Sequence, residues 1–148
     1  MKKQSMTIMA VAMLFATLAV ALVRAQETDN VAVTIPFDFA IGGKTLPAGG
    51  YYLRRSLEGP RIVMQIRSKD DNQSFYLSTH PLQGRDVQSE SKLVFNRYGD
   101  QYFLSQVWIA GRTDGQELAR TSRERVLQRE IAKSKTKPEA IAVAGRPN

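Results

Sequence analysis

Cysteine is absent from the 148 residues, and histidine occurs once, as His80. Without cysteine the chain can form no disulfide, no thiolate metal site, no acylated-cysteine anchor and no cysteine nucleophile. Histidine is the side chain best suited to proton transfer at neutral pH, and a single copy leaves little acid–base chemistry. The composition therefore predicts no metal centre, no cofactor and no enzyme.

Acidic residues are scarce at the two ends of the chain. Residues 1–25 hold three basic and no acidic side chains, and residues 120–148 hold eight basic and three acidic ones. Residues 26–119 hold ten basic and eleven acidic side chains and are close to neutral. The formal net charge of +7 therefore comes from the ends, which indicates a neutral domain with a cationic extension.

Near the N-terminus, the uncharged run Thr7–Val23 follows Lys2 and Lys3. A run of this kind with Ala25 behind it is typical of a secretory signal peptide, here cleaved after Ala25. The alternative is a retained N-terminal membrane anchor, but 17 residues at about 1.5 Å each fall short of a hydrocarbon core of about 30 Å. In both cases we expect the remaining chain to be secreted or periplasmic.

Apolar and polar residues alternate through most of residues 31–109, which is the pattern of half-buried strands. Strands are predicted at 31–39, 51–55, 61–67, 74–79, 92–98 and 101–109, separated by turns rich in glycine, proline and aspartate. Six short strands favour a mainly β fold, either an antiparallel β-sandwich or a small, partly open β-barrel. Residues 80–90 are predicted to form the longest loop. Because no aromatic residue follows Trp108, the core is expected to end near Ala110.

The pattern changes after residue 119. Thr121 and Glu124 have capping-box spacing, and good helix formers continue to about Lys133. Because apolar positions are few, we expect a short, weakly docked C-terminal helix and a disordered end from about Lys135. The expected organisation is a signal peptide over 1–25, a single antiparallel β domain over 26–119, and a basic helix with a disordered tail over 120–148.

Two sequence blocks carry a family resemblance. They are Pro36-Phe-Asp-Phe-Ala-Ile-Gly-Gly-Lys-Thr-Leu-Pro-Ala-Gly-Gly-Tyr51 and Asp100-Gln-Tyr-Phe-Leu-Ser-Gln-Val-Trp108. With a signal peptide ahead of them, they resemble a group of short, uncharacterised secreted bacterial proteins over about residues 31–125. The resemblance implies an exported small β domain with a charged C-terminal end. It implies no catalytic or ligand-binding residue.

The first candidate binding site lies in a predicted strand that holds Tyr51, Tyr52, Arg54 and Arg55. Adjacent side chains of a strand point to opposite faces, so either Tyr51 or Tyr52 faces outward. An exposed tyrosine beside arginine suits a glycan or a peptide, although isolated exposed tyrosines are also common on protein surfaces.

The second candidate is the basic helix, where Arg125, Arg129 and Lys133 recur every four positions, followed by Lys137 if the helix continues to Pro138. They would form a cationic ridge that attracts an anionic envelope component, or a solvated end that keeps the domain soluble. Nucleic acid is not expected as a partner, because the aromatic residues that could stack on bases lie in the β domain. Membrane contact is expected only through an uncleaved signal or through this basic end.

These observations predict an exported, non-catalytic β domain that acts as a binding or structural module at the cell envelope. One alternative is a small β-barrel that carries an apolar ligand inside. The less favoured alternative is a hydrolase in which His80 activates Ser78 or Ser105. Nothing in the spacing of the sequence brings a serine and an acid to His80.

Overall fold

The computed structural model describes residues 30–58, 61–133 and 139–147. The predicted signal peptide and its cleavage site at Ala25 lie outside these residues. Within them, no helix combines the length and the apolar character that a membrane crossing requires.

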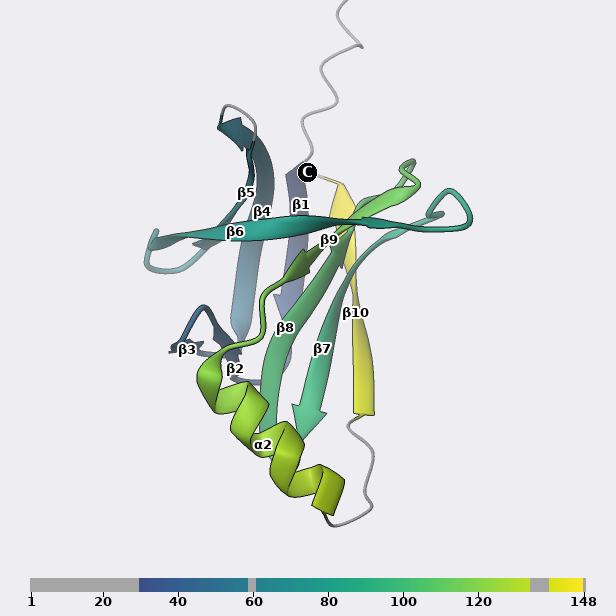
Figure 1. The fold of residues 1–148 in the computed structure, drawn as a ribbon. Helices are drawn as coiled ribbons and strands as arrows, with labels where there is room; N and C mark the ends of the chain where they lie inside the picture. The colour runs from purple at the N-terminus through teal and green to yellow at the C-terminus, as the bar shows by residue number, and fades with distance from the viewer. Residues whose placement is uncertain (1–29, 59–60, 134–138, 148) are drawn as a thin grey trace, which may run out of the picture.

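Strands make up most of the described chain, and a helix lies near its C-terminal end (Figure 1). In chain order the elements are β1 (Asn30–Ile35), β2 (Phe39–Ile41), β3 (Lys44–Leu46), β4 (Gly49–Glu58), β5 (Arg61–Ser68), β6 (Ser74–Gln83), β7 (Ser91–Tyr98), β8 (Gln101–Trp108), β9 (Asp114–Leu118), α2 (Ser122–Lys133) and β10 (Glu139–Pro147).

Eight of these strands close into a barrel. Around it the order is β1, β4, β5, β6, β9, β8, β7 and β10, with β10 beside β1 again, and every neighbouring pair is antiparallel. The β2–β3 hairpin joins β8 through one parallel pair, Ala40 with Phe103. The predicted mainly β fold is confirmed, with the barrel in place of the sandwich. The barrel is closed and has eight strands, so the expected partly open form of about six strands is wrong.

Alternating side chains fill the interior of the barrel. In β1, Val31, Val33 and Ile35 are buried, whereas Thr34 between them is exposed. An eight-stranded barrel is just wide enough for such side chains to fill its centre. The buried hydrophobic cluster comprises Val31, Val33, Ile35, Phe39, Ile41, Leu46, Tyr51, Leu53, Met64, Ile66, Leu93, Phe95, Leu104, Val107 and Leu118.

Strand β9 carries this core past its predicted end near Ala110. Its polar, glycine-containing sequence is typical of a turn, but Gln116 and Leu118 are buried. Gly115 lies under the ring of Trp108, where an added Cβ would come within 2.7 Å of ring carbons. Only glycine therefore lets the ring pack on this backbone. Residues 79–83 pair with β9, so β6 also extends into the predicted loop at 80–90.

The predicted disordered end is wrong for residues 139–147, which form β10 between β1 and β7. Seven of its residues pair with β7 and three with β1. Its two large aliphatic side chains, Ile141 and Val143, alternate with alanines, a composition too poor in large apolar residues to predict a strand. The backbone groups along β1 and β7 supply the partners that the composition does not reveal.

Helix α2 begins as its capping-box spacing predicts. The Glu124 backbone N–H donates a hydrogen bond to Oγ1 of Thr121 at 3.1 Å. The Glu124 carboxylate turns inward, where it is 4% exposed and accepts hydrogen bonds from Nδ2 of Asn96 at 2.9 Å and from the Tyr98 hydroxyl at 3.3 Å. The few apolar residues of α2 are at most half-buried, so this buried carboxylate fixes the helix on β7.

A substitution at Gly145 tests how closely β10 packs against β1. A Cβ at this position would clash with Cγ1 of Val31, which is buried and β-branched and so has few other rotamers. We expect Gly145→Ala to lower the free energy of unfolding by about 1–3 kcal/mol in urea denaturation. Ala144→Ser, on the exposed face of β10, is the matched control and should change it by less than about 0.5 kcal/mol. Wild-type stability of the Gly145 variant would contradict this register.

Candidate functional site

Strand β4 divides the first candidate site between two faces of the barrel. Tyr51 and Arg55 point inward, whereas Tyr52 and Arg54 point outward. Tyr51 is 1% exposed, and its hydroxyl donates a hydrogen bond to the backbone oxygen of Pro47 at 2.7 Å. Burial, followed by the charge of nearby aspartates, raises the pKa of the Tyr51 phenol. Tyr51 is therefore a core residue, and its assignment as a binding residue is wrong.

Tyr52 and Arg54, which face outward on β4, remain on the predicted binding surface. Two cations lie over the ring of Tyr52, the Arg67 guanidinium at 5.5 Å and the Lys69 ammonium at 4.7 Å from the ring centroid. Tyr76 of β6 is 63% exposed, and its hydroxyl accepts a hydrogen bond from Nε2 of Gln65. Arg54 is exposed on the same face. This surface offers stacking and charge, but no pocket among those described is lined by it.

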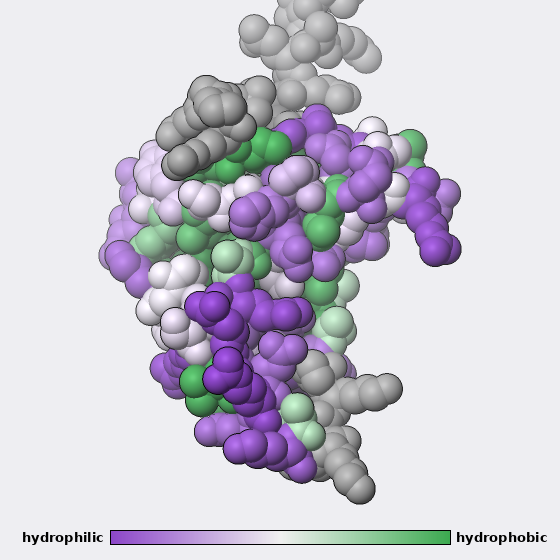
Figure 2. Space-filling model, viewed as in Figure 1, coloured by the Kyte–Doolittle hydropathy of each residue, from purple (hydrophilic) through white to green (hydrophobic). Residues whose placement is uncertain are grey.

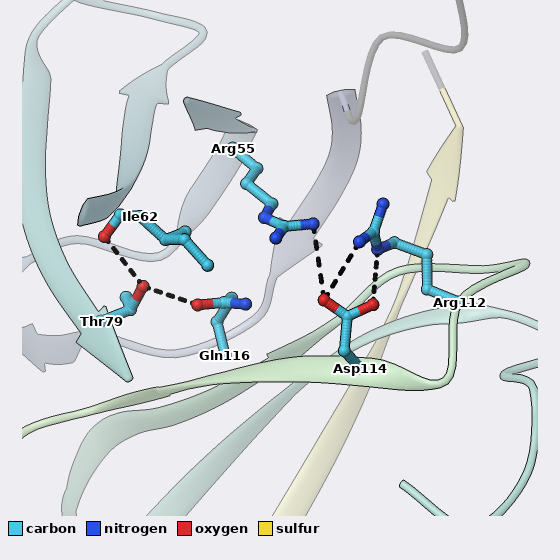
Figure 3. A network of polar contacts seen from close by, with 6 residues as sticks. All are labelled: Arg55, Ile62, Thr79, Arg112, Asp114 and Gln116. Atoms are coloured by element: carbon cyan, nitrogen blue, oxygen red, sulfur yellow. Dashed lines mark hydrogen bonds and ion pairs between the residues drawn. The ribbon is translucent and has the colours of Figure 1, made fainter. Parts of the chain in front are cut away.

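Arg55 belongs to a polar network inside one end of the barrel (Figure 3). Its Nη1 lies 3.5 Å from the Asp114 carboxylate, which also accepts two hydrogen bonds from the Arg112 guanidinium at 2.9 and 3.0 Å. Beside them, the Thr79 hydroxyl donates to Oε1 of Gln116 at 2.8 Å. Charges this close to a core are retained when they are paired, so Arg55 is structural, and its assignment to an outer binding face is wrong.

A groove of about 550 Å³ lies where β6 and β9 face helix α2. Its lining residues come from three parts of the chain and are His80, Glu117, Leu118, Ala119, Arg120, Arg125, Gln128 and Arg129. His80 and Glu117 are opposite each other in the β6–β9 ladder, and Arg125 and Arg129 extend from α2. The groove thus joins two predicted residues of the basic helix to the one histidine.

The lining of this groove is cationic. Three exposed arginines, Arg120, Arg125 and Arg129, face a single carboxylate, that of Glu117. Within the described ranges, none of the three forms an ion pair, and Arg125 has only a 3.5 Å contact with the Ser122 hydroxyl. Figure 2 shows strongly hydrophilic side chains along the exposed side of α2. Unpaired guanidiniums around one hollow are suited to carboxylate or phosphate groups.

Lys133, the third predicted residue of the ridge, is exposed at the end of α2 and is not among the residues that line the groove. Lys137, the fourth, lies outside the described residues. Arg120 was not among the predicted site residues, because it precedes the helix and shows no periodicity with Arg125. His80 meets the arginines only through the pairing of β6 with β9, which sequence spacing does not indicate. The site is therefore built by the topology of the barrel.

The groove offers little to support hydrolysis. Its eight lining residues include an imidazole and a carboxylate but no serine, threonine or cysteine. Ser105, one proposed nucleophile, is a buried residue of β8. The described residues also hold no group of three or more histidine, aspartate or glutamate side chains placed to bind a metal ion. What the lining residues support is the binding of an anion.

A second pocket, of about 210 Å³, lies between the β2–β3 hairpin, the β7–β8 turn and the start of α2. The two sequence blocks of the resemblance both contribute to its lining. Its charges are of both signs, from Asp38 and Asp100 and from Lys44 and Arg123. Asp38 already accepts a hydrogen bond from the Ala48 N–H at 2.8 Å, and the Lys44 ammonium lies over the Phe75 ring. With balanced and partly engaged charges, this pocket indicates no particular ligand.

The pairing of Asp114 predicts that the polar end of the barrel is sensitive to acid. Hydrogen bonding from Arg112, with the charge of Arg112 and Arg55, lowers the pKa of Asp114 from its ordinary value of 3.8. The unfolded chain therefore takes up this proton first, and the stabilisation is present above about pH 4 and lost as the pH falls through the lowered value. We expect Asp114→Asn to be less stable at neutral pH and to show a shallower loss of stability below about pH 4.

Thermal denaturation between neutral and acid pH measures both effects. Asp86→Asn, in an exposed loop, is the matched control and should keep the wild-type acid dependence. An Asp114 variant with the same acid dependence as the wild type would show that the network contributes nothing to the pH response.

Comparisons with known proteins found no matching family model, no matching curated protein and no matching solved structure. The family resemblance of the two sequence blocks stays a prediction.

Proposed function

We propose that this protein is an exported, non-catalytic binding module of the cell envelope, and that the groove between β6, β9 and α2 receives an anionic group of its partner. One observation carries the proposal: Arg120, Arg125 and Arg129 line a single hollow with one carboxylate, that of Glu117, and form no ion pair within the described chain. An envelope glycan or protein that bears carboxylate or phosphate groups supplies the missing charge.

The expected binding is modest and salt-sensitive. An exposed ion pair contributes about 0.2–1 kcal/mol, because water screens it and two long side chains must be ordered. Three arginines together give a useful affinity only for a ligand that contacts several of them. At physiological ionic strength their field extends about 8 Å, so the ligand must enter the groove itself.

Export is the part of the proposal that depends on residues 1–25. A chain recovered outside the inner membrane and beginning at Gln26 supports it, and an intact N-terminus at Met1 contradicts the cleaved signal. The basic helix would then face the anionic material of the envelope.

The interior of the barrel gives no support to the alternative of an apolar ligand. Met64, Leu93 and Phe95, from three strands, are completely buried within the core cluster. Side chains of the protein therefore occupy the centre in which such a ligand would lie. The groove that contains His80 has no serine, threonine or cysteine in its lining, which gives no support to a hydrolase based on His80.

Affinity for tripolyphosphate, measured by titration calorimetry at low salt, tests the groove with a defined probe. We expect Arg125→Gln with Arg129→Gln to weaken binding about tenfold, because two contacts of about 0.7 kcal/mol each are lost. Arg123→Gln with Arg54→Gln removes the same two charges, from another side of α2 and from the outer face of β4, and is the matched control that should bind within about twofold of the wild type.

Circular dichroism spectra identify the variants that keep the wild-type fold, and only the affinities of those variants are compared. Equal losses of affinity in the groove variant and in the double variant of Arg54 and Arg123 would mean that net charge alone attracts the anion, which would contradict the proposed site. Unchanged binding in the groove variant would do the same.

A further inference from the structure

The cationic residues of α2 continue beyond the groove. Arg125, Arg129 and Lys133 are spaced four residues apart, so each lies about 6 Å further along the helix axis, and all three are exposed. The groove receives the first two, whereas Lys133 extends the line by one more turn. From Arg125 to Lys133 the line covers about 12 Å, more than one phosphate group can span.

Acidic side chains of α2 form no ion pair with this line in the described part of the chain. Of the two glutamates in α2, Glu124 is buried against Asn96 and Tyr98. Glu130 is exposed and lies about 100° around the helix from Arg129 and about 60° from Lys133. Like charges four residues apart repel and destabilise an isolated helix by a few tenths of a kcal/mol per pair. A row of anionic groups alongside α2 would remove that repulsion.

We infer that the partner is a linear polyanion that enters the groove and continues along α2 to Lys133. This inference rests on the proposed function and names the class of its ligand. Compact anions engage the groove arginines, whereas a chain with repeated negative groups also reaches Lys133. Binding of this kind is determined by the number and spacing of charges.

Two other classes of partner fit α2 less well. Its sequence contains no aromatic residue, and the exposed Tyr76 and the half-buried Tyr52 lie on β6 and β4, so a nucleic acid would gain no stacking beside the cationic line. Leu127 and Ile131 are half-buried, which leaves Val126 as the large apolar side chain exposed on this helix. A helix that lies in a membrane interface presents a broad apolar face to it, which α2 does not.

Polyphosphates of different length distinguish binding in the groove alone from binding that also extends along α2 to Lys133. We expect the affinity of the wild type to rise from orthophosphate to tripolyphosphate and again to long-chain polyphosphate. Lys133→Gln should weaken binding of the long chain about threefold to fivefold while leaving tripolyphosphate within about twofold. It should also reduce the slope of log affinity against log salt for the long chain by about one charge.

Lys69→Gln is the matched control, because it removes the same charge from the β5–β6 turn, away from α2, and should leave long-chain binding within about twofold. The inference is overturned if Lys69→Gln weakens the long chain as much as Lys133→Gln, or if Lys133→Gln weakens both polyphosphates equally. Tighter binding of an oligothymidylate with the same number of charges would also overturn it, since base stacking would then contribute.

Failure of the proposed function looks different. In that case the Arg125 and Arg129 variant binds tripolyphosphate like the wild type, whatever Lys133 does. If tripolyphosphate depends on the two arginines and the long chain ignores Lys133, the groove stands and the linear polyanion is excluded.

Discussion

The pairing of β10 with both β1 and β7 is the constraint on which the rest of the structure depends. Without β10 these two strands would each present a row of unpaired backbone groups, and the barrel would be an open sheet. The Arg97–Glu139 ion pair, at 3.3 Å, lies at the start of β10, and Gly145 fits against Val31 near its end. The barrel is therefore closed by a strand that has mostly small side chains and that pairs with both β1 and β7.

Closure also determines where the charges of α2 lie. The helix follows β9 and precedes β10 in the chain, and it packs against β7, which lies beside β10 in the barrel. Glu124, bonded to Asn96 and Tyr98, fixes which side of the helix faces that wall. As a result, Arg125 and Arg129 line the same groove as His80 while they remain exposed to solvent.

Local patterns in the sequence predicted the elements that depend on local physics. Alternation predicted β1 and β5, and Thr121 with Glu124 predicted the start of α2. Features that depend on distant partners escaped prediction: β9 needs the Trp108 ring over Gly115, and β10 needs two open edges. The site followed the same division, since Arg125 and Arg129 were visible as a helical repeat, whereas their meeting with His80 and Arg120 depends on strand order.

Hydrogen–deuterium exchange of the backbone amides of β10 tests the central claim most directly, because exchange reports whether each amide is paired in the folded protein. If β10 closes the barrel, its amides and those of the β1 and β7 residues that face it should be protected to an extent similar to the amides of β4 and β5. Exchange of β10 at the rate of an unstructured peptide, with β4 and β5 still protected, would show that the barrel is open there and would contradict the account.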